Sequence, residues 1–515
     1  MKNKLGIEIP EKIEGVGSLI PFQGEFTLIN SQTEKYKTPQ PIRKSKTGHK
    51  LLPDLKNCLE KLSLRDGMCI SFHHHFRGGD ETVFKVISLI AEMGFKNLTI
   101  ASSSLTTAHD PLIPFVENGV ISRIWTSGLR EKLGKTISAG KLGIPVIFHS
   151  HGGRARAIET GKLKVDLAFI AAAAADCEGN ATGSFGKSAC GALGYPMVDS
   201  EYAAEVVVLT DNLVEFPCHP ASIKQHNVDY VVPVDRIGDP KKIGTGSTRL
   251  TRNPLDLRIA QLATQAIDKC GYIKPGFSLQ TGAGGASLAV AKFIRELQRE
   301  RKIKGSFLLG GITSTMVEIL EEGLFNVAYD VQSFDDMVTH SIYKNQQHVE
   351  ISSSQYANPF NAGCFVNMLD VVILAALEVD TDFNVNVLTG SDGLVMGASG
   401  GHCDTAAGAK LTVVVAPSMR ARTPIVRDKI ATIVTPGCSV DLLVTERGIC
   451  VNPARTELIE TLKRSRLPIL EIHDLAKNVE KLCGKPAPIE WDDKIVGLVE
   501  YRDGSIIDVI RKVKS

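Results

Sequence analysis

The fold of this chain is decided by the run Pro275-Gly276-Phe277-Ser278-Leu279-Gln280-Thr281-Gly282-Ala283-Gly284-Gly285, in which a turn, a short apolar segment and a glycine-rich turn follow one another. A similar run, Asp66-Gly67-Met68-Cys69-Ile70-Ser71-Phe72, lies in the first half and leads to Arg77-Gly78-Gly79-Asp80. Glycine at the end of a strand lets the backbone come close to a ligand. The chain therefore contains the same kind of unit twice.

The similarity between the halves continues beyond these runs. Residues 165–172 resemble residues 369–376, and the valine run 206–208 resembles 413–415. An Asp-Asn pair follows the first of these segments in each half, Asp176 with Asn180 and Asp380 with Asn384. Separations of about 205 residues indicate duplicated domains rather than a solenoid of short repeats. A cleft between two related α/β domains is a favoured place for a ligand.

The composition is that of an ordinary globular protein. The chain has 515 residues, 43% hydrophobic and 23% charged, so each half can bury a core. A formal net charge of +2 gives no reason to expect a nucleic-acid partner. The 11 cysteines include no Cys-x-x-Cys pair, which favours reduced thiols over a zinc or redox site. With no signal-peptide pattern and no apolar run of the ~20 residues that span a membrane, we expect a cytoplasmic protein.

Three segments are expected along the chain. Residues 1–50 are a polar extension that ends in the basic stretch 43–50, and composition does not decide between a flexible arm and a packed strap. Residues 51–245 and 246–515 each alternate short apolar runs with helical patterns, which is typical of buried parallel strands in βαβ units. The predicted fold class is two tandem, similar, open parallel-sheet α/β domains. The breaker-rich segment 238–254 is the predicted linker.

Residues 279–287 are the first candidate ligand loop. They lie at the end of a predicted strand and before a helix predicted over 288–301, so the helix N-terminus offers free N–H groups to an anion. A plain tight turn is the alternative. The glycine spacing differs from a dinucleotide fingerprint, and no Gly-Lys-Ser/Thr of a Walker loop is present in that turn.

Residues 393–404 form the second candidate loop. Its small residues could point several N–H groups at a developing oxyanion, although the sequence alone favours a turn between two strands. The presence of the first loop strengthens the functional interpretation. A third candidate is His73-His74-His75 in the first half, whose side chains alternate in direction and cannot all bind one metal ion. We expect one histidine to face the cleft, no metal site, and Asp176 and Glu178 either at the surface or beside the cleft.

At this point four segments resemble one known family. Residues 71–77, 279–285, 396–404 and 440–448, the last followed by Val451-Asn452-Pro453, are similar to the citrate lyase α chain, a citrate CoA-transferase branch of the CoA-transferase superfamily. The similarity runs from about residue 10 to the C-terminus. The loop 396–404 resembles the oxyanion loop of CoA-transferases in general, and the His-His-His-Phe-Arg segment is more particular to the citrate lyase branch.

The resemblance implies two domains of the ribose-5-phosphate isomerase-like type and a transferase reaction. Citrate would replace acetate on an acyl carrier protein, so that acetyl-carrier and citrate give citryl-carrier and acetate. The chain would hold no permanent cofactor and would act on the dephospho-CoA-type prosthetic group of the carrier, with acetyl-CoA as a surrogate. The implied partners are a β subunit that cleaves citryl-carrier and the γ carrier subunit, in an oligomeric complex.

The resemblance also suggests roles for particular residues. Backbone donors for the oxyanion are expected at Gly397, Ala398, Gly400 and Gly401. Donors for the prosthetic-group phosphates are expected at Gly282, Ala283, Gly284 and Gly285. Citrate carboxylates would be read by His74, Arg77, Arg154 and Arg447, each arginine having a surface position as its alternative.

One departure concerns the covalent glutamate of many CoA-transferases, whose Ser-Glu-Asn context is missing. Asp330 is the nearest carboxylate, and the citrate lyase branch is understood to act by direct attack of citrate through a mixed anhydride. Asp330 or Gln332 is therefore expected to position substrate and not to act as a nucleophile. Glu378 is a second carboxylate with either a structural or a functional role.

The sequence is also compatible with two other functions. A citramalate lyase α chain would perform the same chemistry on a related acid. A non-catalytic effector-binding subunit would bind a ligand without turnover and would need only one of the glycine loops. A nicotinamide oxidoreductase is disfavoured because the fingerprint is missing.

Overall fold

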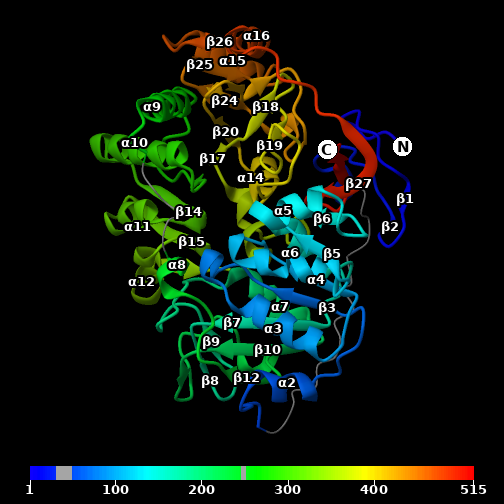
Figure 1. Ribbon diagram of the computed structural model, residues 1–515. Helices are drawn as coiled ribbons and strands as arrows, with labels where there is room; N and C mark the ends of the chain where they lie inside the picture. Colours follow the sequence, from blue (N-terminus) through cyan, green and yellow to red (C-terminus); the bar gives the residue numbers. More distant parts are fainter. Residues whose placement is uncertain (31–48, 245–250, 515) are drawn as a thin grey trace.

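The computed structural model describes residues 1–30, 49–244 and 251–514. Most of the basic stretch 43–50 and the middle of the predicted linker therefore lie outside the described residues. Two large sheets, each with nine strands, form the centre of the molecule (Figure 1). Within the described ranges, no helix combines the length and the apolar character needed to cross a membrane.

The first sheet has the strand order β12-β10-β7-β3-β4-β5-β6-β27-β28. All neighbours from β12 to β27 are parallel, and only the last pair is antiparallel. The strands of the first half are β3 (Cys69–Phe72), β4 (Leu98–Ser102), β5 (Ile121–Thr126), β6 (Val146–Phe148), β7 (Leu167–Ala172), β10 (Glu205–Thr210) and β12 (Tyr230–Pro233).

The second sheet has the order β16-β15-β14-β13-β17-β20-β24-β25-β26. Neighbours from β16 to β24 are parallel. Its strands are β13 (Leu279–Thr281), β14 (Gly305–Ile312), β15 (Phe325–Ser333), β16 (His348–Glu350), β17 (Val371–Ala375), β20 (Leu411–Val415), β24 (Leu442–Thr445), β25 (Gly448–Val451) and β26 (Ile469–Leu470).

The two sheets confirm the duplication. In each half the chain runs outward from a first strand, β3 or β13, through three more strands, and then returns to the other side of that first strand. The Asp-Asn pairs also correspond: Asn180 donates to Asp176 over 2.8 Å, and Asn384 donates to Asp380 over 3.1 Å. Each aspartate is the last residue of a short strand, β8 (Ala174–Asp176) or β18 (Glu378–Asp380), and accepts hydrogen bonds from the turn that follows. The predicted fold class is confirmed.

Helices cover the faces of both sheets. In α9 the buried residues include Ile259, Leu262, Ala263 and Ala266, a spacing that places one apolar face against the sheet. The first half contributes α2 (Leu55–Lys61), α3 (Thr82–Glu92), α4 (Ile113–Glu117), α5 (Glu131–Ser138), α6 (His151–Glu159), α7 (Gly194–Tyr202) and α8 (Pro240–Ile243). The second contributes α9 (Pro254–Lys269), α10 (Gly285–Arg301), α11 (Ser314–Glu321), α12 (Asp336–Lys344), α13 (Ser353–Ala357), α14 (His402–Gly408), α15 (Thr456–Lys463) and α16 (Ile472–Cys483).

The C-terminal segment departs from the predicted domain limits. Residues up to 515 were assigned to the second domain, yet β27 (Trp491–Glu500) pairs with β6 and forms a hairpin with β28 (Ile506–Val513) in the first sheet. The remaining limits stay predictions. Leu498 and Ile506 of this hairpin are buried with Ile9 and Ile147 in one apolar cluster, which explains why the chain returns.

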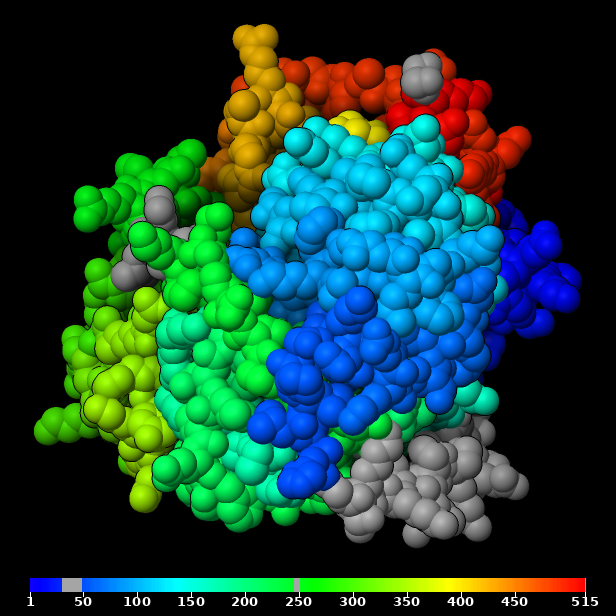
Figure 2. All heavy atoms as spheres, turned by 60° about the horizontal axis from the view of Figure 1, so that its bottom comes forward, coloured from blue at the N-terminus to red at the C-terminus, as the bar shows by residue number. Residues whose placement is uncertain are grey.

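The N-terminal residues 1–30 are a packed strap along this hairpin. They contain β1 (Lys12–Ile13), β2 (Gly17–Ser18) and the short helix α1 (Thr27–Asn30). The Ile506 N–H donates to the Ile20 carbonyl over 2.7 Å, and the Phe22 N–H donates to the Ile506 carbonyl over 3.0 Å. The blue N-terminal and red C-terminal residues consequently lie together at one edge of the molecule (Figure 2).

The halves are joined at a seam, which we define as the contact of residues 397–401 with the ends of β5 and β6. Leu129 N–H donates to the Gly397 carbonyl (3.2 Å), Ser399 N–H to the Ser127 carbonyl (2.8 Å), and His151 N–H to the Gly400 carbonyl (2.8 Å). The second glycine loop of the sequence is therefore held by backbone groups of the first half.

We expect Gly128→Ala to weaken the seam. A Cβ at Gly128 would lie 2.3 Å from Ala398 Cβ and 2.4 Å from the Gly397 carbonyl oxygen, so the loop must move. Overpacking of this kind lowers the free energy of unfolding by ~1–3 kcal/mol. Thermal unfolding should show a lower midpoint for Gly128→Ala, whereas Gly143→Ala, which meets no atom within 4 Å, should match the wild type. Equal midpoints for the two variants would contradict the close packing of Gly128 against the 397–401 loop.

Candidate active site

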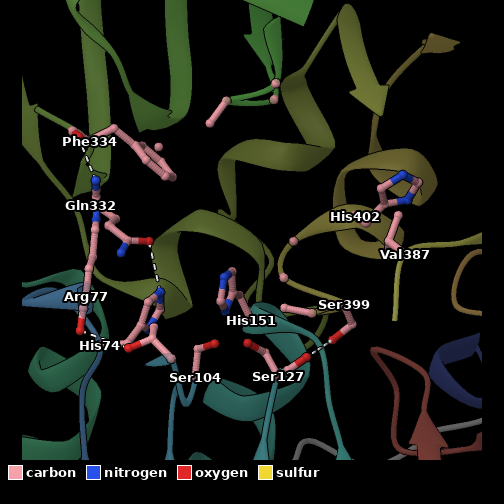
Figure 3. Close-up of a pocket in the computed structure, with 18 of the residues that line it drawn as sticks. His74, Arg77, Ser104, Ser127, His151, Gln332, Phe334, Val387, Ser399 and His402 are labelled. Carbon is pink, nitrogen blue, oxygen red and sulfur yellow. Dashed lines mark hydrogen bonds between the residues drawn. The ribbon is translucent and has the colours of Figure 1, made fainter. Parts of the chain in front are cut away.

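A cleft of about 800 Å³ lies between the two halves. It opens where β3 and β13 end, which are the points at which each sheet reverses its strand order and where α/β proteins bind their ligands. The first half lines it with His74, Arg77, Ser104, Ser127, His151 and Tyr195, among others. The second half contributes Gln280, Thr281, Gly282, Ala283, Gly284, Gln332, Phe334, Tyr356, Ala398, Ser399, Gly400, Gly401 and His402 (Figure 3).

His74 is the histidine of the triplet that faces the cleft, as expected. Its Nδ1 lies 2.6 Å from Ser103 Oγ and its Nε2 lies 3.1 Å from Gln332 Oε1, so the ring joins the two halves. Burial, followed by the neighbouring His151, lowers the pKa of His74 well below its ordinary value, and the ring is neutral at pH 7. The other two histidines are packed against the Ala171 and Val331 carbonyls. Among the described residues, no group of three or more His, Cys, Asp or Glu could hold a metal ion.

Arg77 places a positive charge on the wall of the cleft. Its Nη1 donates to the Phe334 carbonyl over 2.5 Å, its Nη2 donates to the Ser333 carbonyl, and its guanidinium lies 4.3 Å above the Phe334 ring. Burial lowers the pKa of Arg77 to about 10, so it stays protonated near pH 7. The backbone of Arg77 has φ of 50°, a sparsely populated region for a residue other than glycine that often marks functional sites.

The glycine loop 397–401 offers fewer donors than the sequence predicts. Gly397 N–H donates to the Leu388 carbonyl (2.9 Å) and Ala398 N–H to the Val387 carbonyl (3.2 Å), so both are consumed within the second half. Gly397 also does not line the cleft. Among the described residues, no acceptor faces the N–H groups of Gly400 and Gly401. Two of the four predicted donors are therefore available to a ligand.

The start of α10 is the second place where an anion could bind. Gly282, Ala283 and Gly284 line the cleft, while Gly285 begins the helix and does not. The Gly282 N–H is taken by the Ile373 carbonyl at 2.9 Å. The buried hydroxyls of Thr281 and Ser287 have no hydrogen-bond partner within the described part of the chain. Polar groups without partners beside the N-terminus of a 17-residue helix favour an anionic ligand.

Asp330 and Gln332 have different positions. Asp330 is fully buried and does not line the cleft. Its carboxylate accepts hydrogen bonds from the Gln332 N–H (2.8 Å) and the Ser333 hydroxyl (2.6 Å). His348 Nε2 lies 3.2 Å from the same carboxylate. Gln332 does line the cleft and is held by His74. Asp330 thus shapes the segment that carries Gln332.

Three further predicted residues, in addition to Gly285, Gly397 and Asp330, do not line the cleft. Arg154 is 1% exposed and forms a double ion pair with Asp199, at 3.0 and 2.6 Å, so neither the citrate role nor the surface alternative fits it. Arg447 donates to the Ser418 hydroxyl over 2.9 Å in the turn between β24 and β25. Glu378 is buried in an ion pair with Arg427 and is structural. The sequence shows the charge of these three side chains but not the neighbouring side chains with which they pair.

Glu178 is exposed and also lies outside the cleft. Several residues that line the cleft were not predicted from the sequence, among them His151, Tyr195 and Tyr356. The His151 ring lies 5.6 Å from His74 and 4.5 Å from Tyr195 between ring centroids, beside the loop that carries Ser399 (Figure 3). A serine that caps a helix directly after a predicted strand, Ser150 after 145–148, was the available signal for His151.

The first half contains the counterpart of the 397–401 loop at residues 191–194. Leu193 caps α7 as Gly401 caps α14. Here the loop is occupied by side chains of the second half: Leu193 N–H donates to the Glu350 carboxylate, and Ala192 N–H donates to the Ser333 hydroxyl over 3.0 Å. The same kind of turn thus binds an internal carboxylate in one half and faces the cleft in the other.

Two halves with the same strand order, facing each other across a cleft lined by glycine loops, define a CoA-transferase-like α/β protein. The malonate decarboxylase hetero-tetramer of Pseudomonas contains a chain of this fold, with a TM-score of 0.62, 18% identity, and coverage of 85% of this chain and 84% of that one. Residues 48–513 match the family model "Citrate lyase, alpha subunit". The chain therefore belongs to the citrate lyase alpha subunit family, whose members are enzyme subunits of the citrate lyase complex.

Two relatives illustrate how similar the chain is to that family. The citrate lyase alpha chain of Klebsiella pneumoniae is 53% identical over 470 residues, which are 91% of this chain and 92% of the relative. The crystal structure of a citrate lyase alpha subunit from Streptococcus mutans, in complex with citrate, is 50% identical with a TM-score of 0.95 over 100% of both chains.

Glu350 should make stability depend on pH. Burial raises the pKa of Glu350 from 4.5 to about 7, so the folded state holds this proton more tightly than the unfolded chain. The stabilisation is present below pH 4.5 and is lost as pH rises to about 7. Glu350→Gln imitates the neutral acid. We therefore expect the variant to unfold at a higher temperature than the wild type at pH 8, and this difference should be smaller at pH 5.

Thermal unfolding from pH 5 to 8 measures this difference, and Glu117→Gln, at an exposed glutamate, is the control. Burial also raises the pKa values of Asp80 and Asp508 to about 7, so the variant should flatten the pH dependence only in part. Parallel curves for the wild type and Glu350→Gln would show that Glu350 is ionised in the fold throughout this range.

Proposed function

We propose that this chain transfers an acyl carrier from acetate to citrate, so that acetyl-carrier and citrate give citryl-carrier and acetate. The observation that carries the proposal is the cleft itself, in which the available N–H groups of Gly400 and Gly401 share one cavity with the cation of Arg77. The citrate that accompanies the Streptococcus mutans structure supports citrate as the acid.

The reaction begins when a citrate carboxylate attacks the thioester carbonyl carbon. The carbonyl electrons move to oxygen, and the Gly400 and Gly401 N–H groups stabilise this oxyanion; each such donor contributes ~3 kcal/mol. The oxyanion collapses, the carbon–sulfur bond breaks, and the carrier leaves as a thiolate from a citryl–acetyl mixed anhydride. The thiolate then attacks the citryl carbonyl and expels acetate. No enzyme nucleophile takes part, in keeping with the internal hydrogen bonds of Asp330.

In this scheme, different parts of the cleft bind the prosthetic group and the citrate. The phosphates of the dephospho-CoA-type prosthetic group bind at Ala283, Gly284 and the hydroxyl of Thr281, beside the α10 N-terminus. Citrate's other carboxylates meet the charge of Arg77 and the amide of Gln332, which His74 holds in place. A β subunit would receive the citryl-carrier for cleavage to oxaloacetate, and the γ subunit would be the carrier.

An exchange assay tests the proposal directly. The purified chain, mixed with acetyl-CoA and isotopically labelled citrate, should form labelled citryl-CoA and free acetate, both detected by mass spectrometry. Citramalate in place of citrate should react more slowly, because it lacks one carboxylate that Arg77 would bind. Faster exchange with citramalate would assign the chain to that acid. Ligand binding without exchange, also with a true acetyl-carrier, would leave an effector-binding subunit.

The direct-attack mechanism makes a separate prediction. Incubation with acetyl-CoA and no citrate, followed by borohydride or hydroxylamine, should leave the mass of the chain unchanged, because Asp330 does not reach the cleft. A CoA-transferase that uses a covalent glutamate is the positive control. Reduction or hydroxamate formation at Asp330, found by peptide mapping, would replace direct attack with a covalent mechanism.

A further inference from the structure

We propose that Tyr356 and His151 are catalytic residues that act as neutral hydrogen-bond donors and complete the oxyanion pocket begun by Gly400 and Gly401. The proposal rests on the transfer reaction above. It adds two side chains, one from each half of the molecule, to the backbone donors of the glycine loop.

Tyr356 has a hydroxyl hydrogen available at the right place. The side chain is 3% exposed, lines the cleft, and accepts a hydrogen bond from Gln280 Nε2 over 2.8 Å. Because that bond uses the oxygen as acceptor, the hydroxyl can donate its own hydrogen to a ligand. A Cβ at Gly401 would lie 2.5 Å from this oxygen, so the hydroxyl is beside the Gly401 backbone. Burial raises the pKa of Tyr356, which keeps it protonated.

His151 approaches the same turn from the other side. Its backbone N–H donates to the Gly400 carbonyl, and a Cβ at Gly400 would lie 3.7 Å from its Nε2. Nδ1 is buried without a hydrogen-bond partner in the described chain, so Nε2 is the nitrogen that a ligand in the cleft can reach. Burial, with His149 and Arg154, lowers the pKa of His151 to about 3. At neutral pH the ring is therefore uncharged, and with its proton on Nε2 it can donate to a ligand in the cleft.

Asp404 positions His151 and is not itself in contact with the cleft. Its carboxylate accepts from the Ser150 hydroxyl over 2.8 Å and from the Gly152 N–H over 2.9 Å. These bonds fix the first turn of α6, where His151 is the first residue. Because Asp404 lies on α14, directly after the glycine loop, the loop and the histidine are placed by one structural unit.

The counterpart loop shows that a carboxyl group can bind at this position. In the first half, the N–H of Leu193 binds the carboxylate of Glu350, the last residue of β16. The last residue of β6, the strand equivalent to β16, is Phe148, which offers no carboxylate to Gly401. The second-half loop, which caps its helix in the same way, therefore faces a cleft in place of the internal acid.

Neutral donors suit a reaction whose nucleophile is itself an anion. A cation at this turn would bind the attacking carboxylate as strongly as the oxyanion, which lowers the ground state together with the transition state. An uncharged hydroxyl and imidazole interact most strongly when charge develops on the carbonyl oxygen. Removal of one such donor typically lowers kcat by a factor of about 10² to 10³.

The test compares Tyr356→Phe with Tyr329→Phe, a matched loss of a hydroxyl at a tyrosine that packs on Phe365 outside the cleft. With acetyl-CoA and citrate, Tyr356→Phe should lower kcat by about 10²-fold. Citrate affinity, measured by calorimetry, should change by less than about threefold, since the lost interaction belongs to the transition state. Tyr329→Phe should match the wild type in both readouts.

His151 gives an independent pair of variants. His151→Ala should lower kcat by about 10²-fold, and His151→Gln, which keeps an N–H donor, should recover part of it. The kcat of the wild type should show no ionisation of His151 between pH 6 and 8. A wild type that catalyses exchange while Tyr356→Phe and His151→Ala retain kcat within about threefold would overturn this proposal alone. A wild type without exchange would overturn the proposed function and this proposal together.

Discussion

The rest of the structure depends on the seam at which residues 397–401 of the second half bind the strand ends of the first. Three backbone hydrogen bonds fix the loop, and the Ser399 hydroxyl adds a fourth to the His149 carbonyl at 2.6 Å. These bonds hold Gly400 and Gly401 in the lining of the cleft and bring His151 beside them. A donor pocket made in this way is preorganised, because its geometry is set by the packing of two domains.

Duplication explains the architecture, and departures from symmetry explain where chemistry can occur. Both halves share a strand order, a glycine loop and an Asp-Asn turn. In the first half Glu350 and Ser333 occupy the loop, and in the second half the loop faces the cleft. The two loops therefore have different roles. The 191–194 loop holds the domains together, and the 397–401 loop is available to substrate.

The sequence was a good guide to the fold and to backbone features of the site. Short apolar strands, glycine turns and the repeat are local signals, and they pointed to residues 282–284, residues 398–401 and His74, which line the cleft. It was a poor guide to contacts between distant segments. Nothing near Gly397 shows that its N–H is taken by Leu388, and nothing near Arg154 shows Asp199 beside it. Tyr356 lies on a five-residue helix that periodicity does not detect.

The return of the C-terminal hairpin to the first sheet has a consequence for how the chain is made. Until residues 491–513 emerge from the ribosome, β6 is an edge strand with unpaired backbone groups, and the N-terminal strap has no hairpin to lie on. The first half cannot complete its sheet during synthesis, although most of it is finished early. The first sheet is therefore completed only after residues 491–513 have been synthesised, and until then the open edge of β6 can pair with other strands.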